Sequence, residues 1–337
     1  MTRAAQARLA ALPRFPLAVL PTPLTAAKAL GAAVGLPGLW LKRDELIGFG
    51  FGGNKVRVLE LLVADALAHN ADVLVTGAGA QSNHVRATAA AAAYAGLGCV
   101  AIFWGDRPAE PQGNFALTRM LGAQCRFTSD QDRQSVDRGI DAACAALRAE
   151  GHRPYAIPRG GACALGVAGH VLAVRELQLQ CEALHLEPSA VVLAAGSGGT
   201  LAGWVLGKRL FGARFRIEAV VVSRPATETR ARVRTLAAEA AALIDFDLGA
   251  SPDSDDDFAV HDGFIGEGYG IPTPEGLAAI RTAARTAGVF FDPTYTGKAF
   301  AGLTALAASG RFRDQGPVVF LHTGGEPALF AHAGALA

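Results

Sequence analysis

Lysine is scarce in this sequence, so each lysine can be considered individually. Against 26 arginines, the chain carries only Lys28, Lys42, Lys55, Lys208 and Lys298. Arginine stays protonated, whereas a desolvated lysine amine can lose its proton and act as a nucleophile. Lys55 follows Gly52-Gly53-Asn54 and opens a stretch of helical character. It is therefore the candidate for covalent chemistry, although an ordinary lysine in this position would be a solvated residue of a first helical turn.

Charge is also sparse, and long hydrophobic runs are missing. Charged residues make up 18% of the 337 residues and apolar residues 51%, which is enough to bury the core of one or two domains. No apolar stretch without glycine, proline or charge is long enough to cross a bilayer. The net charge is +1 and the basic residues are scattered. We therefore expect a small-molecule partner, with neither nucleic acid nor a membrane.

The cysteines are five in number and show no Cys-x-x-Cys spacing. This pattern argues against a disulfide framework or a zinc site, and we expect no metal. Only Cys163 lies in a glycine-rich turn. Residues 1–43 contain arginines but no acid, as transit peptides do, yet they lack serine and prolines interrupt them. We expect a cytoplasmic protein. The acidic run 251–257 lacks the glycine and spaced ligands of a calcium loop, so we expect a solvated loop there.

Short apolar segments alternate with glycine-bearing turns and alanine-rich helical stretches. Strands are predicted at 72–76, 98–103, 190–195, 217–222 and 317–321. Continuous apolar strands that alternate with helices indicate parallel sheets covered on both faces, so the predicted fold class is α/β. The turn-rich stretch 151–161 is the best candidate for a crossing between two domains.

The loop Gly196-Ser197-Gly198-Gly199-Thr200 lies between a predicted strand and a predicted helix. Glycines let the backbone approach an anion, and the N–H groups that open a helix point toward it. The loop lacks the lysine of a Walker motif and the spacing of a dinucleotide fingerprint. We interpret it as a phosphate cradle; the alternative is an ordinary turn of small residues.

Two further groups of polar residues follow predicted strands or occupy turns. Gln81, Ser82 and Asn83 could bind a carboxylate, or Ser82 and Asn83 could simply cap a helix. The next residue, His84, is by itself more often structural than catalytic. Tyr269 and Tyr295, two of only four tyrosines, lie in glycine-flanked turns. A phenol there can be an acid, a base or a stacking plate, although packing with the hydroxyl in water is commoner.

Together these segments resemble the pyridoxal-phosphate lyases of the D-cysteine desulfhydrase and 1-aminocyclopropane-1-carboxylate deaminase family. The resemblance runs from Phe15 to Phe330 and rests on six motifs in the family's order. These are 41–44 (Leu-Lys-Arg-Asp), 52–55 (Gly-Gly-Asn-Lys), 81–84 (Gln-Ser-Asn-His), 196–200, 292–298 (Asp-Pro-Thr-Tyr-Thr-Gly-Lys) and 322–325 (His-Thr-Gly-Gly).

The resemblance implies the tryptophan synthase β-like fold, fold type II, with pyridoxal 5'-phosphate between two domains. Residues 48–160 should form a small inserted domain, and 1–47 with 161–337 the large domain. The family also suggests a homodimer.

The resemblance assigns roles to individual residues. Lys55 corresponds to the Schiff-base lysine and Asn54 to its neighbour on the side of the ring hydroxyl. The residues that correspond to the binding loop for the cofactor phosphate are Gly196, Ser197, Gly198, Gly199 and Thr200. Gln81, Ser82 and Asn83 correspond to residues that bind the substrate carboxylate. Asn83 should also lie near the cofactor, and Ser82 is also a candidate for proton transfer. Tyr269 and Tyr295 correspond to the two active-site tyrosines, and Thr296 or Thr323 should lie near the pyridine nitrogen.

Position 296 discriminates within the family. Cyclopropane-opening deaminases carry glutamate there, which can hold the pyridine nitrogen protonated, whereas this chain has Thr296. A threonine leaves a poorer electron sink, which suits β-elimination. We therefore expect elimination from a small sulfur-bearing amino acid, D-cysteine, to give pyruvate, sulfide and ammonia. The family alternatives are an L-cysteate sulfo-lyase and a 1-aminocyclopropane-1-carboxylate deaminase.

Two other classes compete with a lyase. One is a nucleotide-binding oxidoreductase built on residues 196–200, which would give Lys55 no role. The other is a non-catalytic protein that binds pyridoxal phosphate or a nucleotide. Glu326 departs from the family pattern, in which a small or apolar residue stands near the cofactor. There it could repel an anionic substrate or attract a cationic one.

Overall fold

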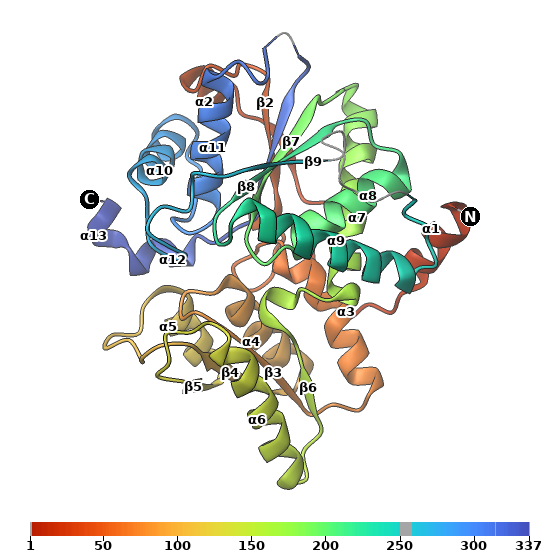
Figure 1. Cartoon of the computed structure of the whole chain (residues 1–337), viewed down its shortest axis with the longest axis vertical. Helices are drawn as coiled ribbons and strands as arrows, with labels where there is room; N and C mark the ends of the chain where they lie inside the picture. The colour runs from red at the N-terminus through yellow and green to blue at the C-terminus, as the bar shows by residue number, and fades with distance from the viewer. Residues whose placement is uncertain (1, 250–257, 314, 337) are drawn as a thin grey trace.

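The computed structural model describes residues 2–249, 258–313 and 315–336, so the acidic run 251–257 lies outside the described residues. The described chain contains two sheets (Figure 1). The larger has six strands in the order β1-β2-β10-β7-β8-β9. Its strands are β1 (Leu24–Ala26), β2 (Leu39–Arg43), β7 (Ala190–Ala195), β8 (Arg216–Val221), β9 (Phe258–His261) and β10 (Val318–His322).

The smaller sheet has four strands in the order β5-β4-β3-β6. They are β3 (Val73–Ala78), β4 (Gly98–Phe103), β5 (Gln124–Phe127) and β6 (Pro154–Ala156). All pairs in this sheet are parallel, and in the larger sheet only β1 runs antiparallel to its neighbour. The predicted α/β class with helix-covered parallel sheets is therefore confirmed, and all five predicted strands occur within one or two residues of the expected bounds.

Helices cover both faces of the larger sheet. One core joins the sheet to α1 (Thr2–Ala11), α7 (Ala164–Leu184), α8 (Gly199–Phe211) and α9 (Ala226–Leu243). The other joins it to α2 (Lys28–Ala33), α10 (Pro274–Ala287) and α11 (Thr296–Ala308). The short helices α12 (Pro327–Ala331) and α13 (Ala333–Leu336) end the described chain.

The smaller sheet is covered in the same way. Its helices are α3 (Lys55–Ala68), α4 (Asn83–Ala95), α5 (Gly113–Met120) and α6 (Ser135–Ala149), with α6 on the face opposite α3 and α4. Helix α4 shows why the sequence folds this way locally. Ser82 caps its N-terminus by accepting a bond from Val85 N–H, alanines fill its interior, and Gly96 ends it in the left-handed conformation.

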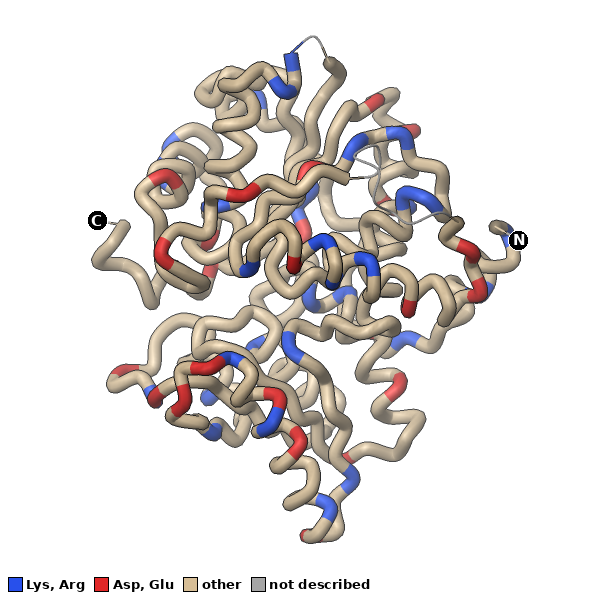
Figure 2. Tube along the Cα trace, viewed as in Figure 1, with Lys and Arg blue, Asp and Glu red and all other residues tan. Residues whose placement is uncertain are grey.

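The two sheets are formed by different parts of the chain. Strands β3 to β6 all come from residues 73–156, and both ends of the chain build the other sheet. We propose that these correspond to the small domain 48–160 and to the large domain 1–47 with 161–337. Acidic and basic residues are interspersed over the chain (Figure 2). In the described ranges no helix is both long and apolar enough to span a bilayer.

Candidate active site

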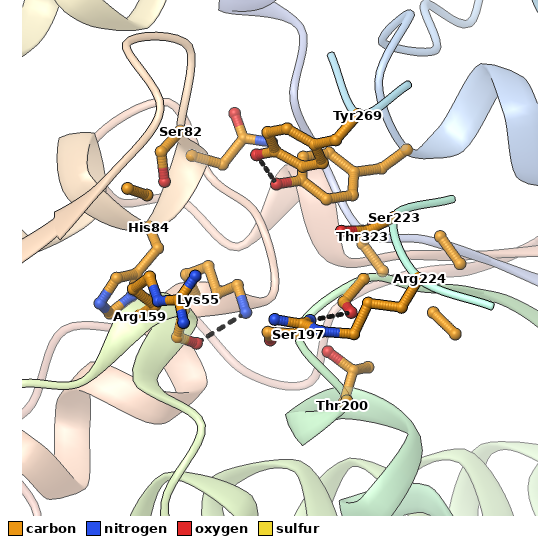
Figure 3. Close-up of a pocket in the computed structure, with 18 of the residues that line it drawn as sticks. Lys55, Ser82, His84, Arg159, Ser197, Thr200, Ser223, Arg224, Tyr269 and Thr323 are labelled. Atoms are coloured by element: carbon orange, nitrogen blue, oxygen red, sulfur yellow. Dashed lines mark hydrogen bonds between the residues drawn. The ribbon is translucent and has the colours of Figure 1, made fainter. Parts of the chain in front are cut away.

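One pocket gathers most of the residues singled out from the sequence. Figure 3 shows the pocket around Lys55. The residues predicted from the sequence that line it are Asn54, Lys55, Ser82, Asn83, Gly196, Ser197, Gly198, Thr200, Tyr269, Tyr295 and Thr323. Ser82 opens α4 just after β3, the 196–200 loop follows β7, and Thr323 follows β10. The pocket therefore lies at the carboxyl ends of strands from both sheets, where open α/β sheets bind ligands.

Lys55 is the first residue of α3, and its amine faces the pocket. The Nζ atom donates a 2.9 Å hydrogen bond to the carbonyl oxygen of Gly160. No carboxylate contacts it among the described residues, and burial lowers the pKa of the amine from 10.5 to about 8. At pH 7 about a tenth of the Lys55 amine is therefore neutral, far more than for an ordinary lysine, and the neutral form is the one that a nucleophilic amine requires.

The two positions before Asn54 and Lys55 require glycine for steric reasons. Gly52 and Gly53 have φ values of 64° and 97°, which favour glycine. A Cβ atom at Gly52 would overlap the carbonyl of Glu45, and one at Gly53 would come 3.0 Å from the carbonyl oxygen of Thr323. Gly53 thus lets the start of α3 pack directly on the turn that follows β10, and Gly52 lets it pack on the backbone of Glu45.

The 196–200 loop has the geometry of an anion cradle. Helix α8 begins at Gly199, and Gly198 has a left-handed φ of 92°. Arg224 donates to the carbonyl of Gly196 at 3.0 Å, and Arg232 donates to the carbonyl of Ser197 at 2.7 Å. The arginines occupy the carbonyl side of the loop, so the N–H groups at the start of α8 stay available to an anion.

Asn54 connects this cradle with the start of α3. Its side-chain amide donates to the hydroxyl of Thr200 at 2.9 Å, and its backbone N–H donates to the carbonyl of Thr323 at 3.1 Å. The residue before Lys55 thereby fixes the lysine relative to both the 196–200 loop and the turn after β10.

In the 81–84 segment, some side chains make hydrogen bonds within the fold and others line the pocket. Ser82 does both, because it caps α4 and also lines the pocket. The side chain of Gln81 does not point into the pocket, where it was expected to bind the substrate carboxylate. Its amide accepts a bond from the N–H of Asn114 at 2.9 Å and donates to the carbonyl of Gln112 at 3.1 Å, so its side chain points toward α5. His84 is buried against Thr76, and burial lowers its pKa to about 3.

The two tyrosines form a pair. The Tyr269 and Tyr295 hydroxyls share a short hydrogen bond, and their rings meet edge to face with centroids 5.8 Å apart. Burial raises the pKa of both phenols above the usual 10. Lys298 holds the loop before Tyr269 by donating to the carbonyls of Ile265 and Gly268 at 2.6 and 3.0 Å. Both phenols are therefore protonated at neutral pH and able to donate.

The structure distinguishes the two threonines considered for the pyridine nitrogen. The hydroxyl of Thr296 donates to Asp292 at 2.8 Å and accepts from the Asp292 N–H at 2.7 Å. Thr296 is fully buried and does not line the pocket, whereas Thr323 does. Thr323 is therefore the threonine available to a bound ring.

Glu326 also departs from its expected place. It is absent from the pocket lining in the described chain and turns toward His322, with Oε1 at 3.9 Å from Nε2. Glu45 approaches the other ring nitrogen of His322 at 3.7 Å. Burial raises the pKa of Glu326 to about 7 and that of Glu45 to about 8. The two carboxyls thus flank His322 and do not line the pocket, Glu45 being buried and Glu326 half-buried.

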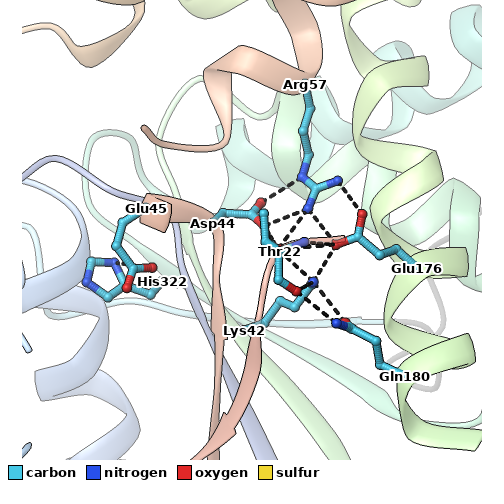
Figure 4. Close-up of polar contacts among 8 residues, drawn as sticks. All are labelled: Thr22, Lys42, Asp44, Glu45, Arg57, Glu176, Gln180 and His322. Carbon is cyan, nitrogen blue, oxygen red and sulfur yellow. Dashed lines mark hydrogen bonds and ion pairs between the residues drawn. The ribbon is translucent and has the colours of Figure 1, made fainter. Parts of the chain in front are cut away.

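A buried ion network anchors α3 at Arg57, two residues after Lys55 (Figure 4). The Arg57 guanidinium donates to Asp44 at 2.7 and 3.0 Å and to Glu176 at 2.9 Å through two nitrogens. Lys42 donates to Glu176 and, at 2.9 Å, to Gln180. The network ties the helix that begins at Lys55 to β2 and α7.

Sequence reasoning missed a set of cationic and aromatic pocket residues. Trp104, Arg133, Arg159, Ser223 and Arg224 also line the cavity. Of these, Trp104, Ser223 and Arg224 follow predicted strands, at 98–103 and 217–222, which was the available signal. Arg133 lies before α6 and Arg159 in the turn after β6, and only the folded chain brings these two to Lys55.

Comparison with known proteins gives the family. The family described as "Pyridoxal-phosphate dependent enzyme" matches residues 16–324. The D-cysteine desulfhydrase of Serratia proteamaculans (strain 568) is 39% identical, over 97% of this chain and 98% of its own. That of Klebsiella pneumoniae (strain 342) is 38% identical, over 96% and 97%.

Solved structures of similar proteins agree with this family assignment. A crystal structure of an ACC deaminase homologue superposes with a TM-score of 0.90 at 34% identity, covering 100% of this chain and 99% of that one. A fungal L-serine ammonia-lyase from Rhizomucor miehei shares the fold with a TM-score of 0.68 at 18% identity, over 95% and 98% of the two chains.

Proposed function

Because this chain belongs to the family of pyridoxal-phosphate-dependent enzymes, we propose that it is a lyase that cleaves D-cysteine to pyruvate, sulfide and ammonia. The observation that carries the proposal is the Lys55 amine, which has a lowered pKa and shares one pocket with a phosphate-type loop and a tyrosine pair. The near full-length similarity to D-cysteine desulfhydrases supports the substrate.

The pocket fits pyridoxal phosphate by its donor set. The N–H groups at 196–200 suit the phosphate, the neutral amine of Lys55 suits the aldehyde, and Thr323 offers a hydroxyl to the ring nitrogen. At Gly196 a Cβ atom would come 3.0 Å from the Tyr295 ring, so the missing side chain keeps the floor of the pocket open. When bound, the cofactor withdraws electrons from the α carbon of an amino acid.

We assign the proton at the α carbon to Lys55, with Ser82 as the second candidate. A Lys55 amine with a pKa of about 8 can accept a proton near neutral pH and return it. The Ser82 hydroxyl lines the same pocket and already accepts the Val85 N–H, so its own proton is free to be donated. Ser82 and Asn83, at the start of α4, suit the substrate carboxylate.

The tyrosine pair suits the leaving group. Both phenols keep their protons because burial raises their pKa, and the short Tyr269–Tyr295 contact lets one hydroxyl support the other as it donates. Donation to the departing sulfur favours cleavage of the C–S bond.

Ring opening of 1-aminocyclopropane-1-carboxylate is the weaker alternative. It benefits from a protonated ring nitrogen, and in the described chain no Asp or Glu lines the pocket. Thr323 is a hydrogen-bonding partner without charge, which favours elimination over reactions that need a long-lived carbanion.

The protein as purified tests the proposal. We expect a yellow protein with a band near about 410–420 nm from the lysine-bound cofactor, and we expect Lys55→Ala to abolish it. The exposed Lys28→Ala is the matched control and should keep the colour. A colourless wild type that takes up no added pyridoxal phosphate would refute the cofactor assignment for Lys55.

Substrates should be assayed in parallel. The substrates are D-cysteine, L-cysteate and 1-aminocyclopropane-1-carboxylate. For each substrate, the assay measures the release of pyruvate or 2-oxobutyrate. Pyruvate from D-cysteine supports the proposal, and 2-oxobutyrate from the cyclopropane substrate alone would replace it. If none reacts with a yellow protein, the desulfhydrase proposal is wrong while the cofactor assignment stands.

We further propose that the protein is a cytoplasmic homodimer. The five thiols in the described structure are all free, which supports a reducing compartment. Light scattering after gel filtration measures the assembly state, and a monomer would contradict the dimer.

A further inference from the structure

Arg133 differs from the other two arginines of the pocket in its surroundings. Arg159 makes a two-bond pair with Asp137 at 2.7 and 2.8 Å, and Arg224 pairs with Glu228 at 2.6 Å. Within the described ranges Arg133 has no carboxylate partner. The charges of the other two arginines are therefore offset by their partners, whereas the charge of Arg133 acts on the groups that it contacts.

The Arg133 guanidinium contacts two aromatic rings. Its central carbon lies 4.9 Å from the ring centroid of Tyr269 and 5.8 Å from that of Trp104. Its hydrogen bonds are two long ones to Ser223, at 3.3 Å to Oγ and 3.4 Å to the carbonyl oxygen. A cation this close to a ring is attracted by the electrons of the ring face, and at these lengths the hydrogen bonds are weak. The rings therefore set the place of the charge.

The phenol that Arg133 contacts is joined to a second phenol. The Tyr269 and Tyr295 hydroxyls share the short hydrogen bond described above. A positive charge beside a phenol ring favours negative charge on its oxygen, so the hydroxyl becomes a stronger donor, and linked hydrogen bonds polarise one another. Burial raises the pKa of both phenols, and the Arg133 charge acts in the opposite direction on each. One cation thus influences the whole tyrosine pair.

We propose that Arg133 is a positioning residue for the elimination, which makes the Tyr269–Tyr295 pair a stronger proton donor to the departing sulfur. This inference rests on the proposed lyase function and goes beyond it by assigning the electrostatic support of the leaving group. The support comes from a side chain that acts through Tyr269 and makes no contact with the reacting atoms.

The proton and electron movements balance within this step. As the C–S bond breaks, its electron pair leaves with the sulfur, and the proton of the Tyr295 hydroxyl goes to that sulfur. The Tyr269 hydroxyl donates to the negative charge that develops on the Tyr295 oxygen, and Arg133 strengthens this donation. Water returns a proton to Tyr295 after the sulfide has left. No oxidant or reductant is needed.

Arg133 also bridges the two sheets, because it precedes α6 and contacts Ser223 after β8 and Tyr269. A purely structural bridge would affect every step of the reaction alike. The test therefore compares a step that needs a proton donor with steps that need none. D-cysteine needs a proton on its leaving sulfur, and β-chloro-D-alanine releases chloride, which needs no proton. D-alanine has no leaving group and can only exchange its α proton with solvent.

Three variants separate charge from packing. Arg133→Met removes the charge at a similar side-chain length, Arg133→Lys keeps the charge, and Arg138→Gln changes an exposed arginine of α6 as the matched control. We expect Arg133→Met to lower kcat/KM for D-cysteine by about 5- to 30-fold, the factor that a cation–π contact represents. Turnover of β-chloro-D-alanine and exchange of the D-alanine α proton, followed by NMR in deuterated water, should fall by less than about twofold. Arg133→Lys should recover part of the loss.

Equal losses in all three measurements would overturn the inference, because they would show a structural bridge or a contact with the substrate. A double-mutant cycle gives a sharper test. Tyr269→Phe lacks the hydroxyl through which Arg133 acts, so adding Arg133→Met to it should lower kcat/KM for D-cysteine by less than about a further twofold. A second loss as large as that of Arg133→Met alone would likewise overturn the inference.

A last readout is independent of turnover. The chain has only four tyrosines, so the carbon-13 NMR signal of each phenol carbon can be assigned with single phenylalanine variants. Arg133→Met should shift the Tyr269 and Tyr295 signals of the holoenzyme and leave those of Tyr94 and Tyr155 in place. Unchanged signals would refute the action of Arg133 on the pair. A wild-type enzyme that cleaves neither D-cysteine nor β-chloro-D-alanine would instead refute the proposed lyase function itself.

Discussion

The amine of Lys55 donates its hydrogen bond to the carbonyl oxygen of Gly160, at 2.9 Å, across 105 residues of chain. Gly160 lies in the turn between β6 and α7 and has a left-handed φ of 72°. A Cβ atom there would come 2.7 Å from the Ser197 hydroxyl and 3.6 Å from the Lys55 amine. One glycine thus spaces the lysine from the phosphate loop.

We expect Gly160→Ala to weaken retention of pyridoxal phosphate by about tenfold or more, because its methyl group would displace Ser197 in the cradle. The measurement is cofactor loss on dialysis, followed by absorbance. Gly151→Ala is the control, since Gly151 has a similar φ of 88° but open space around the new methyl group. Equal cofactor loss in both variants would show that backbone strain, not contact with Ser197, is responsible.

Tyr295→Phe should lower kcat/KM for D-cysteine by about 100-fold, because the variant cannot donate a proton to the departing sulfur. With β-chloro-D-alanine, whose chloride needs no proton, the loss should be small. Tyr155→Phe is the comparison, because its hydroxyl bonds to Asp65 on α3, away from the pocket. A large loss on both substrates would assign Tyr295 to positioning instead of proton donation.

Arg57→Met should destabilise the protein strongly, by about 3–5 kcal/mol, because the buried Asp44 and the half-buried Glu176 would be left without the guanidinium. Urea unfolding followed by circular dichroism measures the change. The exposed Arg138→Met should stay within about 0.5 kcal/mol of wild type. A small effect at Arg57 would mean that Lys42 alone neutralises the two carboxylates.

Glu326→Gln should change how stability depends on pH. Burial raises the pKa of Glu326 from 4.5 to about 7, so the folded protein binds more protons than the unfolded chain between these values. The free energy of unfolding therefore falls as pH rises through this window, and the cost of the buried charge is complete above pH 7. The neutral glutamine should flatten this fall and stabilise the protein at pH 8 by about 1–2 kcal/mol.

Melting temperatures of wild type and Glu326→Gln from pH 5 to 8.5 test this expectation. Glu239→Gln, on the exposed side of α9, serves as the control. Parallel curves for wild type and Glu326→Gln would show that another group, such as Glu45, takes up the proton instead.

Much of the candidate active site was predictable from the sequence because its parts are local. Lys55 at the start of a helix, the 196–200 loop after a strand and Ser82 at a helix cap each depend on a few neighbouring residues. Parallel strands then bring these segments to one edge of a sheet, since the carboxyl ends of all such strands point the same way. The alternation of strands and helices likewise predicted the α/β class.

Only the tertiary structure decided which side chains turn into the pocket. Gln81 is drawn away by the backbone at 112–114, Thr296 by Asp292, and Glu326 by its place beside His322. Arg133 enters because Ser223 and Tyr269, about 90 and 136 residues away along the chain, meet it there. The direction of a side chain depends on partners from distant segments, and the sequence pattern around each residue does not contain them. The chain by itself determined the candidate lysine and the fold that presents it, and the folded arrangement decided which arginine and tyrosine side chains surround it.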